Sequence, residues 1–295
     1  MRSVLALFFL AWATSHSPPC EGLGSSTQQS RITPEAVLNH LNVHRERAGV
    51  TKVRLLEGLS RGCDLHALYL AKNNRKGLNA HEESTDEIGY TKEGAEAGKR
   101  AVICAFPSGG EPREAVDSLM GMPYHRVKML DPDLSSVGIG WAYRANGEAL
   151  FVMDVSTTDH TAKSKTYPVL YPVPDQKEIP LEFGLGRGEL PNPVPVEGAT
   201  PGYPITLQFD YGGWRPLETE ARLYVGEKEV PCWVSSPQKP AREDLPQPLW
   251  VGLIPKEKLR VETTYTVKFH CKQAGRENTP AYSKEWSFTT WKSPP

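Results

Sequence analysis

The sequence lacks an excess of charge of either sign, since 34 Lys and Arg stand against 35 Asp and Glu for a net charge of −1. A dedicated nucleic-acid binder needs a basic excess to displace counterions from phosphates, so the composition excludes nucleic acid as a partner. Beyond the first 17 residues, no apolar stretch approaches the roughly 20 residues of a membrane-spanning helix. We therefore expect the mature chain to carry no transmembrane anchor.

Several catalytic and metal-binding motifs are also missing. The five cysteines form no C-x-x-C, and no paired Cys/His spacing of a zinc site occurs. His81-Glu82 lacks the second His that a zinc-protease helix carries. The stretch 107–110 is not the G-x-S-x-G of a serine hydrolase, and 184–188 lacks the following helix of a phosphate-binding loop. We interpret both as loops.

The N-terminus has the pattern of a secretory signal peptide. Arg2 precedes an apolar stretch from Ser3 to Ala13, and small or polar residues continue to Ser17. The alternative is a buried N-terminal helix. We predict a signal peptide over 1–17, a flexible spacer over 18–30, and a protein that is secreted, extracellular or in the cell envelope. Cys20 raises the question of lipidation, which the preceding prolines disfavour and leave open.

The remaining cysteines fall into two pairs along the chain. In an exported protein, the bridges Cys63–Cys104 and Cys232–Cys271 are the favoured interpretation, because each pair lies within one expected domain. Buried thiols are the alternative, and spacing by itself does not decide between the two.

The first half of the chain is expected to hold helices followed by strands. Thr33, Pro34 and Glu35 form a typical helix start, and Gly49 ends that helix. Further helices are predicted over about 59–74 and 114–120. Strands over 137–143 and 150–155 are predicted to form a hairpin joined through Asn146-Gly147. Together they predict an α+β domain over 31–160.

Proline distinguishes the second half. Of the 26 prolines, 15 lie between Pro168 and Pro248. They predict a Pro-rich linker over 161–200 that leads into an all-β domain over 201–295. Six short alternating segments are typical of an immunoglobulin-like sandwich: 205–209, 221–225, 230–234, 250–254, 265–271 and 286–290.

A series of short motifs between residues 39 and 155 resembles the CAP superfamily (cysteine-rich secretory proteins, antigen 5 and pathogenesis-related proteins), in particular its short bacterial members. The motifs, in order, are Asn42-Val-His-Arg45, Ala80-His81-Glu82, Gly89-Tyr90 with Glu93, Pro123-Tyr-His125-Arg126, and Val137-Gly-Ile-Gly140. The resemblance implies an α-β-α sandwich whose central cleft is lined by two His and two acidic side chains.

Carried onto this sequence, the resemblance makes His81, His125 and Glu93 the cleft residues, which could hold a divalent metal such as zinc. Glu96 competes with Glu93. The fourth position has no clear match, although Glu82 is adjacent to His81, and Arg126 is a further candidate. The alternative is that His125 and Arg126 cap a turn near Asp131 or Asp133, and that His81 is a solvated loop residue.

Other candidates have simpler explanations. His40 and His44 have the i, i+4 spacing of helical metal ligands, but we expect a solvated helix face. His66 is expected to be a hydrogen-bonded core residue. Asp154 either joins the cleft or caps a turn.

We therefore expect a secreted binding or interaction module, and the resemblance implies lipid, carbohydrate or protein ligands. The alternative is a metal-assisted hydrolase that uses the same cleft, in which case a carboxylate would activate water. A third interpretation is an architectural envelope protein with a degenerate cleft.

Overall fold

A four-stranded sheet lies at the centre of the N-terminal half. The computed structural model describes residues 32–73, 75, 77–107, 110–161, 167–186, 188–209, 215–245, 247, 249–274 and 281–292. The sheet has the order β1-β3-β4-β2 and consists of β1 (Arg54–Leu55), β3 (Leu134–Tyr143), β4 (Ala149–Thr158) and β2 (Ala101–Phe106). The predicted signal peptide, spacer and Cys20 lie outside the described residues.

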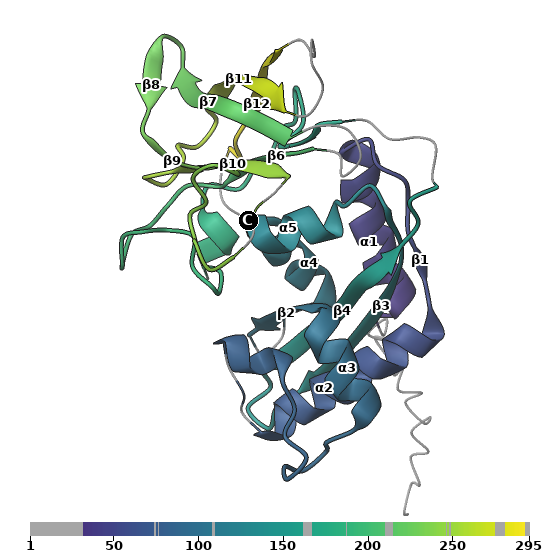
Figure 1. Cartoon of the computed structure of the whole chain (residues 1–295). Helices are drawn as coiled ribbons and strands as arrows, with labels where there is room; N and C mark the ends of the chain where they lie inside the picture. The colour runs from purple at the N-terminus through teal and green to yellow at the C-terminus, as the bar shows by residue number, and fades with distance from the viewer. Residues whose placement is uncertain are drawn as a thin grey trace, which may run out of the picture. The chain divides into compact units, whose positions relative to one another are not determined.

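Helices cover both faces of this sheet (Figure 1). On one face lie α1 (Pro34–Arg47), α4 (Pro112–Met120) and α5 (Pro123–Met129), and their buried residues belong to the same cluster as Val102, Ile139 and Met153. On the other face lie α2 (Glu57–Asn73), η1 (Gly77–His81) and α3 (Lys92–Arg100), and residues of α2 cluster with Ala101 and Val152. The strands alternate their side chains between the two layers, so the expected α-β-α sandwich is present.

Local sequence signals account for several of these elements. Thr33 caps α1 and accepts a hydrogen bond from the Ala36 N–H, and Pro34 starts the helix as predicted. Gly138 and Gly140 allow α2 to approach β3, because a Cβ at either position would lie 2.4 Å from the backbone of Leu59 or Asp64. Sequence analysis placed no element at α3, β2 or α5.

The Asn42/Arg45 motif of α1 has a structural role. The Asn42 side-chain amide exchanges two hydrogen bonds of 2.9 Å with the backbone of Val53. Fully buried Arg45 donates to the carbonyls of Thr51, Met129 and Leu134, among others. Burial lowers its pKa to about 10. The motif therefore holds the loop that follows α1 and the segment that follows α5.

The second half consists of two antiparallel four-stranded sheets. One has the order β5-β6-β10-β9 and is formed by β5 (Val169–Tyr171), β6 (Ile205–Gln208), β10 (Trp250–Pro255) and β9 (Cys232–Ser235). The other has the order β12-β11-β7-β8 and is formed by β12 (Tyr282–Thr289), β11 (Thr264–Ala274), β7 (Arg215–Val225) and β8 (Lys228–Val230). Each of the six predicted strands overlaps an observed one, whereas β5 and β8 were not predicted.

The segment expected to be a linker takes part in the fold. It contributes β5, which pairs with β6, and the short helix η2 (Phe183–Gly186). Ile32–Pro295 form one compact unit, and one hydrophobic cluster includes buried residues from both halves. The β half therefore lies against the α/β half rather than at the end of an extended connection. Within the described residues, no helix has the length and apolar character needed to cross a membrane.

The prediction of two disulfides is wrong, because the four cysteines among the described residues form none. Cys63 lies in the cluster with Ala101 on one face of the sheet, while Cys104 belongs to the cluster on the opposite face, so the sheet separates them. Cys232, at the start of edge strand β9, donates to the Val230 carbonyl, whereas Cys271 lies beside Tyr282. Burial raises the thiol pKa of Cys63 and Cys232 to about 12, so both are unreactive at neutral pH.

Candidate functional site

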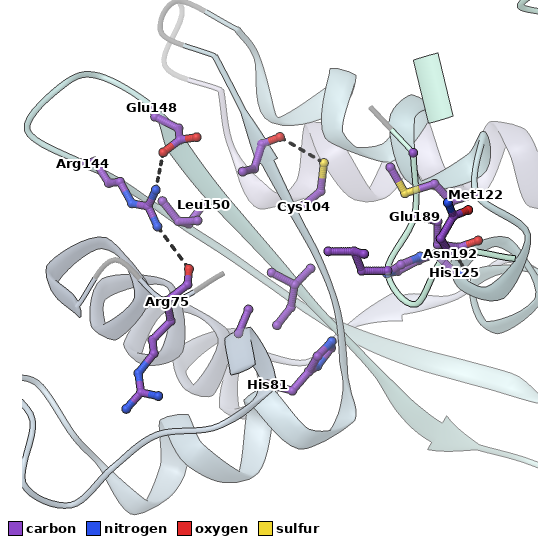
Figure 2. A pocket seen from close by; sticks show the side chains of 15 residues that line it. Arg75, His81, Cys104, Met122, His125, Arg144, Glu148, Leu150, Glu189 and Asn192 are labelled. Atoms are coloured by element: carbon purple, nitrogen blue, oxygen red, sulfur yellow. Dashed lines mark hydrogen bonds and ion pairs between the residues drawn. The ribbon is translucent and has the colours of Figure 1, made fainter. Parts of the chain in front are cut away.

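A cavity of about 540 Å³ contains both predicted cleft histidines (Figure 2). His81 comes from the end of η1, and His125 comes from the first turn of α5. The lining combines apolar side chains with ionisable ones: Ala80, Ile103, Cys104, Ala105, Met122 and Leu150, and Arg75, His81, His125, Arg144, Glu148 and Glu189, completed by Gly188, Leu190 and Asn192. Residues 188–192 thus bring a segment of the expected linker into the site.

His81 is held by the backbone. Its Nδ1–H donates to the Gly98 carbonyl, 2.9 Å away, at the end of α3. This bond leaves the Nε2 lone pair available in the neutral ring. Burial lowers the His81 pKa, and the neighbouring His125 lowers it further by charge repulsion. The imidazole is therefore a neutral hydrogen-bond acceptor at physiological pH.

His125 is held by a carboxylate. Its Nδ1–H donates to Glu189 Oε1, and the same carboxylate accepts the backbone N–H groups of His125 at 2.9 Å and Tyr124 at 3.3 Å. The side chain of Glu189 is fully buried. Glu189 therefore both caps α5 and orients the His125 ring, which explains why it is tolerated inside the protein.

Glu189 is a candidate site residue that no sequence pattern predicted. It lies 64 positions from His125, in a Pro-rich segment with no catalytic motif. The resemblance placed the acidic cleft residues near 82–96, so no local signal pointed to 189. Only the packing of the 188–192 segment against α5 reveals it.

None of the acidic residues predicted for the cleft, Glu82, Glu93 and Glu96, lines the cavity. Glu93 lies on α3, where its half-exposed carboxylate pairs with Arg61 of α2 at 3.3 Å. Glu96, one turn later, pairs with Lys99 at the surface, and this pairing lowers its pKa. Glu82 is exposed. The glycine-rich α3 lies against His66 and turns its carboxylates away from the cavity.

The metal centre predicted from His81, His125 and Glu93 does not fit this geometry. A catalytic zinc takes three protein ligands about 2 Å away. In the described parts of the chain, no third His, Cys, Asp or Glu ligand atom joins His81 and His125 within ligand distance. Glu189 binds Nδ1 of His125, as an orienting carboxylate does. Two imidazoles remain, which suit hydrogen bonding to a ligand better than metal chelation.

Arg126 is predicted as a further cleft residue, but it is fully buried outside the cavity. Its guanidinium donates to the Met120 and Pro204 carbonyls and lies between the rings of Tyr171 and Tyr203, 4.9 and 4.8 Å from the ring centroids. It does not pair with Asp131 or Asp133. Arg126 thus joins α5 to the β half, a role that required contacts about 80 residues away.

Two arginines extend the polar side of the cavity. Arg144 forms an ion pair with Glu148 and donates to the Arg75 carbonyl at 3.3 Å (Figure 2). Its Nε is buried and has no hydrogen-bond partner within the described structure. Arg75 pairs with Glu87 at 2.8 Å. Both guanidinium groups are thus held by carboxylates, and the unpartnered Nε of Arg144 is itself buried.

The expectation for His66 is confirmed. It is fully buried, and its ring nitrogens contact Glu83 at 2.9 Å and the Ala80 carbonyl at 2.7 Å. Asp154 does not line the cavity; it pairs with Arg100 and accepts the Ser156 N–H. Both residues therefore stabilise the walls of the site without entering it.

The expectation of a solvated face at His40 and His44 is wrong. His44 is only 8% exposed, and both rings contact Asp117 of α4. The i, i+4 spacing was the available signal, but the carboxylate that completes the group lies 73 residues beyond His44. The helix face is covered because α4 packs against α1.

The comparisons with known proteins agree with this fold. The family model described as CAP, the cysteine-rich secretory protein family, matches residues 38–155. A search of curated proteins finds no match.

Two solved structures are similar at 14% identity. One is an outer surface protein from Borrelia burgdorferi, with a TM-score of 0.31 over 40% of this chain and 87% of that one. The other is an extracellular protein containing a SCP domain from Bacillus anthracis, with a TM-score of 0.30 over 42% of this chain and 44% of that one. Both are too distant to inform function.

The matched range begins on α1 and ends on β4, so it covers the central sheet, the helices on both of its faces and both cavity histidines. The motifs found in the sequence lie within the same range. Residues 38–155 of this chain match the CAP family of cysteine-rich secretory proteins, as the motifs in the sequence predicted.

Proposed function

We propose that the protein is an exported interaction protein that binds its ligand in the cavity that its CAP domain forms together with residues 188–192. The observation that carries this proposal is the pair His81 and His125, which reach one cavity from different elements, each anchored through Nδ1. Anchoring of one ring nitrogen pre-orients each imidazole, which reduces the cost of ordering it on binding. Neither ring has another hydrogen-bond partner through Nε2 among the described residues.

The lining indicates the chemistry of the ligand. Ile103, Leu150 and Met122 provide apolar surface, while the two imidazoles and Arg144 provide polar contacts. A site of this kind suits a ligand with an apolar body and a head that donates a hydrogen bond to an imidazole Nε2. We infer a lipid-like ligand with a hydroxyl head. A carbohydrate or a protein segment would lack either the apolar body or the compact head.

Export and domain organisation complete the proposal. The N-terminal sequence pattern supports a signal peptide over 1–17, and the matched family is described as secretory. We propose a CAP domain over 31–160, a connecting segment over 161–200 and an immunoglobulin-like module over 201–295. The two antiparallel sheets of the second half support the last assignment. In this organisation the β module supports the wall that carries Glu189.

Binding of 1-decanol, a hydroxyl group on an apolar chain, tests the proposed ligand class. Isothermal titration calorimetry of the full chain should show saturable binding that weakens at least tenfold in the double variant His81→Gln, His125→Gln. The matched control is His160→Gln, His270→Gln, which also removes two histidines but leaves the cavity lining unchanged. If both double variants bind 1-decanol as the wild type does, the cavity is not the binding site. Saturable binding of a disaccharide without binding of 1-decanol would replace the lipid-like class by carbohydrate.

The alternative, a metal-assisted hydrolase in the same cavity, has less support because Glu93 pairs with Arg61 outside it. That activity would require a metal whose binding depends on His81 and His125. Elemental analysis of the wild type and of the variant at these two positions separates the two functions. We expect binding of 1-decanol to be independent of metal.

A further inference from the structure

A second histidine group lies away from the cavity, where α1 meets α4. His40 and His44 are one helical turn apart, with ring centroids 5.1 Å from each other. Both Nε2 atoms lie 2.9 Å from the same oxygen, Oδ1 of Asp117. None of the three residues lines the cavity. Among the described residues, these three side chains form a group whose candidate ligand atoms all lie within 4.8 Å of one another.

The His44 ring is oriented by a second hydrogen bond. Its Nδ1 lies 2.8 Å from the hydroxyl of Tyr171 on β5, and Gln176 Nε2 donates to the same hydroxyl at 3.4 Å. Tyr171 and Gln176 are both buried. Hydrogen bonding of the outer ring nitrogen is what fixes the tautomer and direction of a metal-binding histidine. The β half therefore positions a ring of the α/β half.

Solvent reaches one side of the group. The side chain of His40 is 30% exposed and that of Asp117 is 41% exposed, whereas that of His44 is 11% exposed. Water can therefore take the position that three protein ligands leave open on a tetrahedral metal. The carboxylate lies between the two rings, so it can balance part of the charge of a divalent ion.

We propose that His40, His44 and Asp117 bind a divalent first-row transition metal such as zinc, through the two Nε2 atoms and a carboxylate oxygen. Zinc binds histidine and carboxylate at about 2.0–2.2 Å, so its ligand atoms lie about 3.3 Å apart. The observed 2.9 Å separations require only a small opening. The metal replaces the two protons that now bridge Nε2 and Asp117, and each neutral ring carries its proton on Nδ1 instead. In His44, that proton is donated to Tyr171.

The ligands of the proposed site, and the residue that orients one of them, come from three different elements. Two ligands come from α1 and one from α4, while Tyr171 links the group to β5. A metal here would tie three elements together near the junction of the two halves. None of these residues lines the cavity, so we expect metal binding here to be independent of ligand binding there.

Zinc titration of the full chain, after treatment with a chelator, tests the site. We expect one zinc per chain by calorimetry, and loss of binding by at least tenfold in the double variant His40→Gln, His44→Gln. The control His160→Gln, His270→Gln should bind zinc as the wild type does. Tyr171→Phe keeps the ring but removes the hydroxyl, and it should weaken zinc binding about tenfold, the lower end of the effect of orienting partners.

A measurement on the wild type guards against variants that fail to fold. Zinc should shift the imidazole NMR resonances of His40 and His44 and leave those of His81 and His125 in place. The proposal fails if the wild type binds no stoichiometric zinc, or if zinc shifts the resonances of the cavity pair instead. Binding of 1-decanol reports on the cavity separately, so either proposal can fail without the other.

Discussion

The two histidine pairs of this protein differ in how each meets its carboxylate. In the cavity, only His125 contacts an acid, Glu189, whose side chain is fully buried. On α1, both rings share Asp117, whose side chain is 41% exposed. The cavity pair comes from two separate elements, whereas the α1 pair comes from one helix. Glu189 orients the ring of His125, whereas Asp117 contacts both rings of its pair, as a carboxylate that binds a metal ion together with them would.

The difference teaches what makes histidines a binding surface or a metal centre. Rings anchored to separate acceptors keep their outer nitrogens apart and available to an organic ligand. Rings that converge on one carboxylate place three donor atoms together, as a metal requires. The burial of each carboxylate also predicts how much its removal destabilises the fold, because a buried group left without a partner is far more costly than an exposed one.

The largest effect is expected from Glu189→Ala. The substitution leaves the N–H groups of Tyr124 and His125 without their acceptor inside the protein, and it releases the His125 ring. We expect the free energy of unfolding to fall by about 2–4 kcal/mol, measured by urea denaturation. Glu182→Ala, which removes a partly exposed carboxylate paired with Lys258, is the control and should change little. Equal effects of the two variants would contradict the structural role of Glu189.

A smaller effect is expected from Asp117→Asn in metal-free protein. The two rings hold the Asp117 pKa well below its ordinary value, although burial opposes this. Its ionised form therefore stabilises the fold above the unfolded pKa near 3.9, and this contribution is lost as pH falls through the folded pKa. Because the side chain is 41% exposed, we expect a loss of only about 1 kcal/mol at pH 7. A loss as large as that of Glu189→Ala would erase the contrast between the two pairs.

A pH dependence is expected from His81. Burial lowers its pKa in the folded protein, so the unfolded chain binds a proton near pH 6.5 that the folded chain resists. Stability is therefore complete above that pH and falls as pH decreases toward the folded pKa. We expect His81→Gln to flatten urea-derived stability between pH 7.5 and 5.5. An unchanged slope would show that His81 is not desolvated.

The smallest effect is expected from Glu93→Gln. Its carboxylate is 43% exposed, and its partner Arg61 is 74% exposed, so the pair contributes little. Thermal denaturation and binding of 1-decanol should both remain as in the wild type. Weaker binding of 1-decanol by this variant would show that Glu93 belongs to the cleft.

The sequence predicted much of the fold because its signals are local. Thr33-Pro34 marks the start of α1, and Asn146-Gly147 joins two strands that pair from Tyr143 with Ala149 onward. Elements without a local pattern were missed: α3 contains two glycines, and β5 is only three residues long between prolines. The predicted disulfides failed because spacing does not show which face of the sheet a cysteine occupies.

The candidate site was predicted in part. The motifs around His81 and His125 identified the two imidazoles that line the cavity. The carboxylates were misplaced, because Glu189 and Asp117 lie 64 and 73 residues from the histidines they contact. No spacing rule covers such a distance. The same reason applies to Arg126, whose acceptor Pro204 is 78 residues away.

By itself, the sequence determined the nature of the parts: a balanced charge, helices before strands, a proline-rich second half, and histidines at recognisable motifs. These follow from the chemistry of single residues and their near neighbours. The tertiary structure decided which carboxylate each histidine meets and which charges are buried. Those outcomes depend on how α4, α5 and the 188–192 segment pack, and packing is a property of the whole chain.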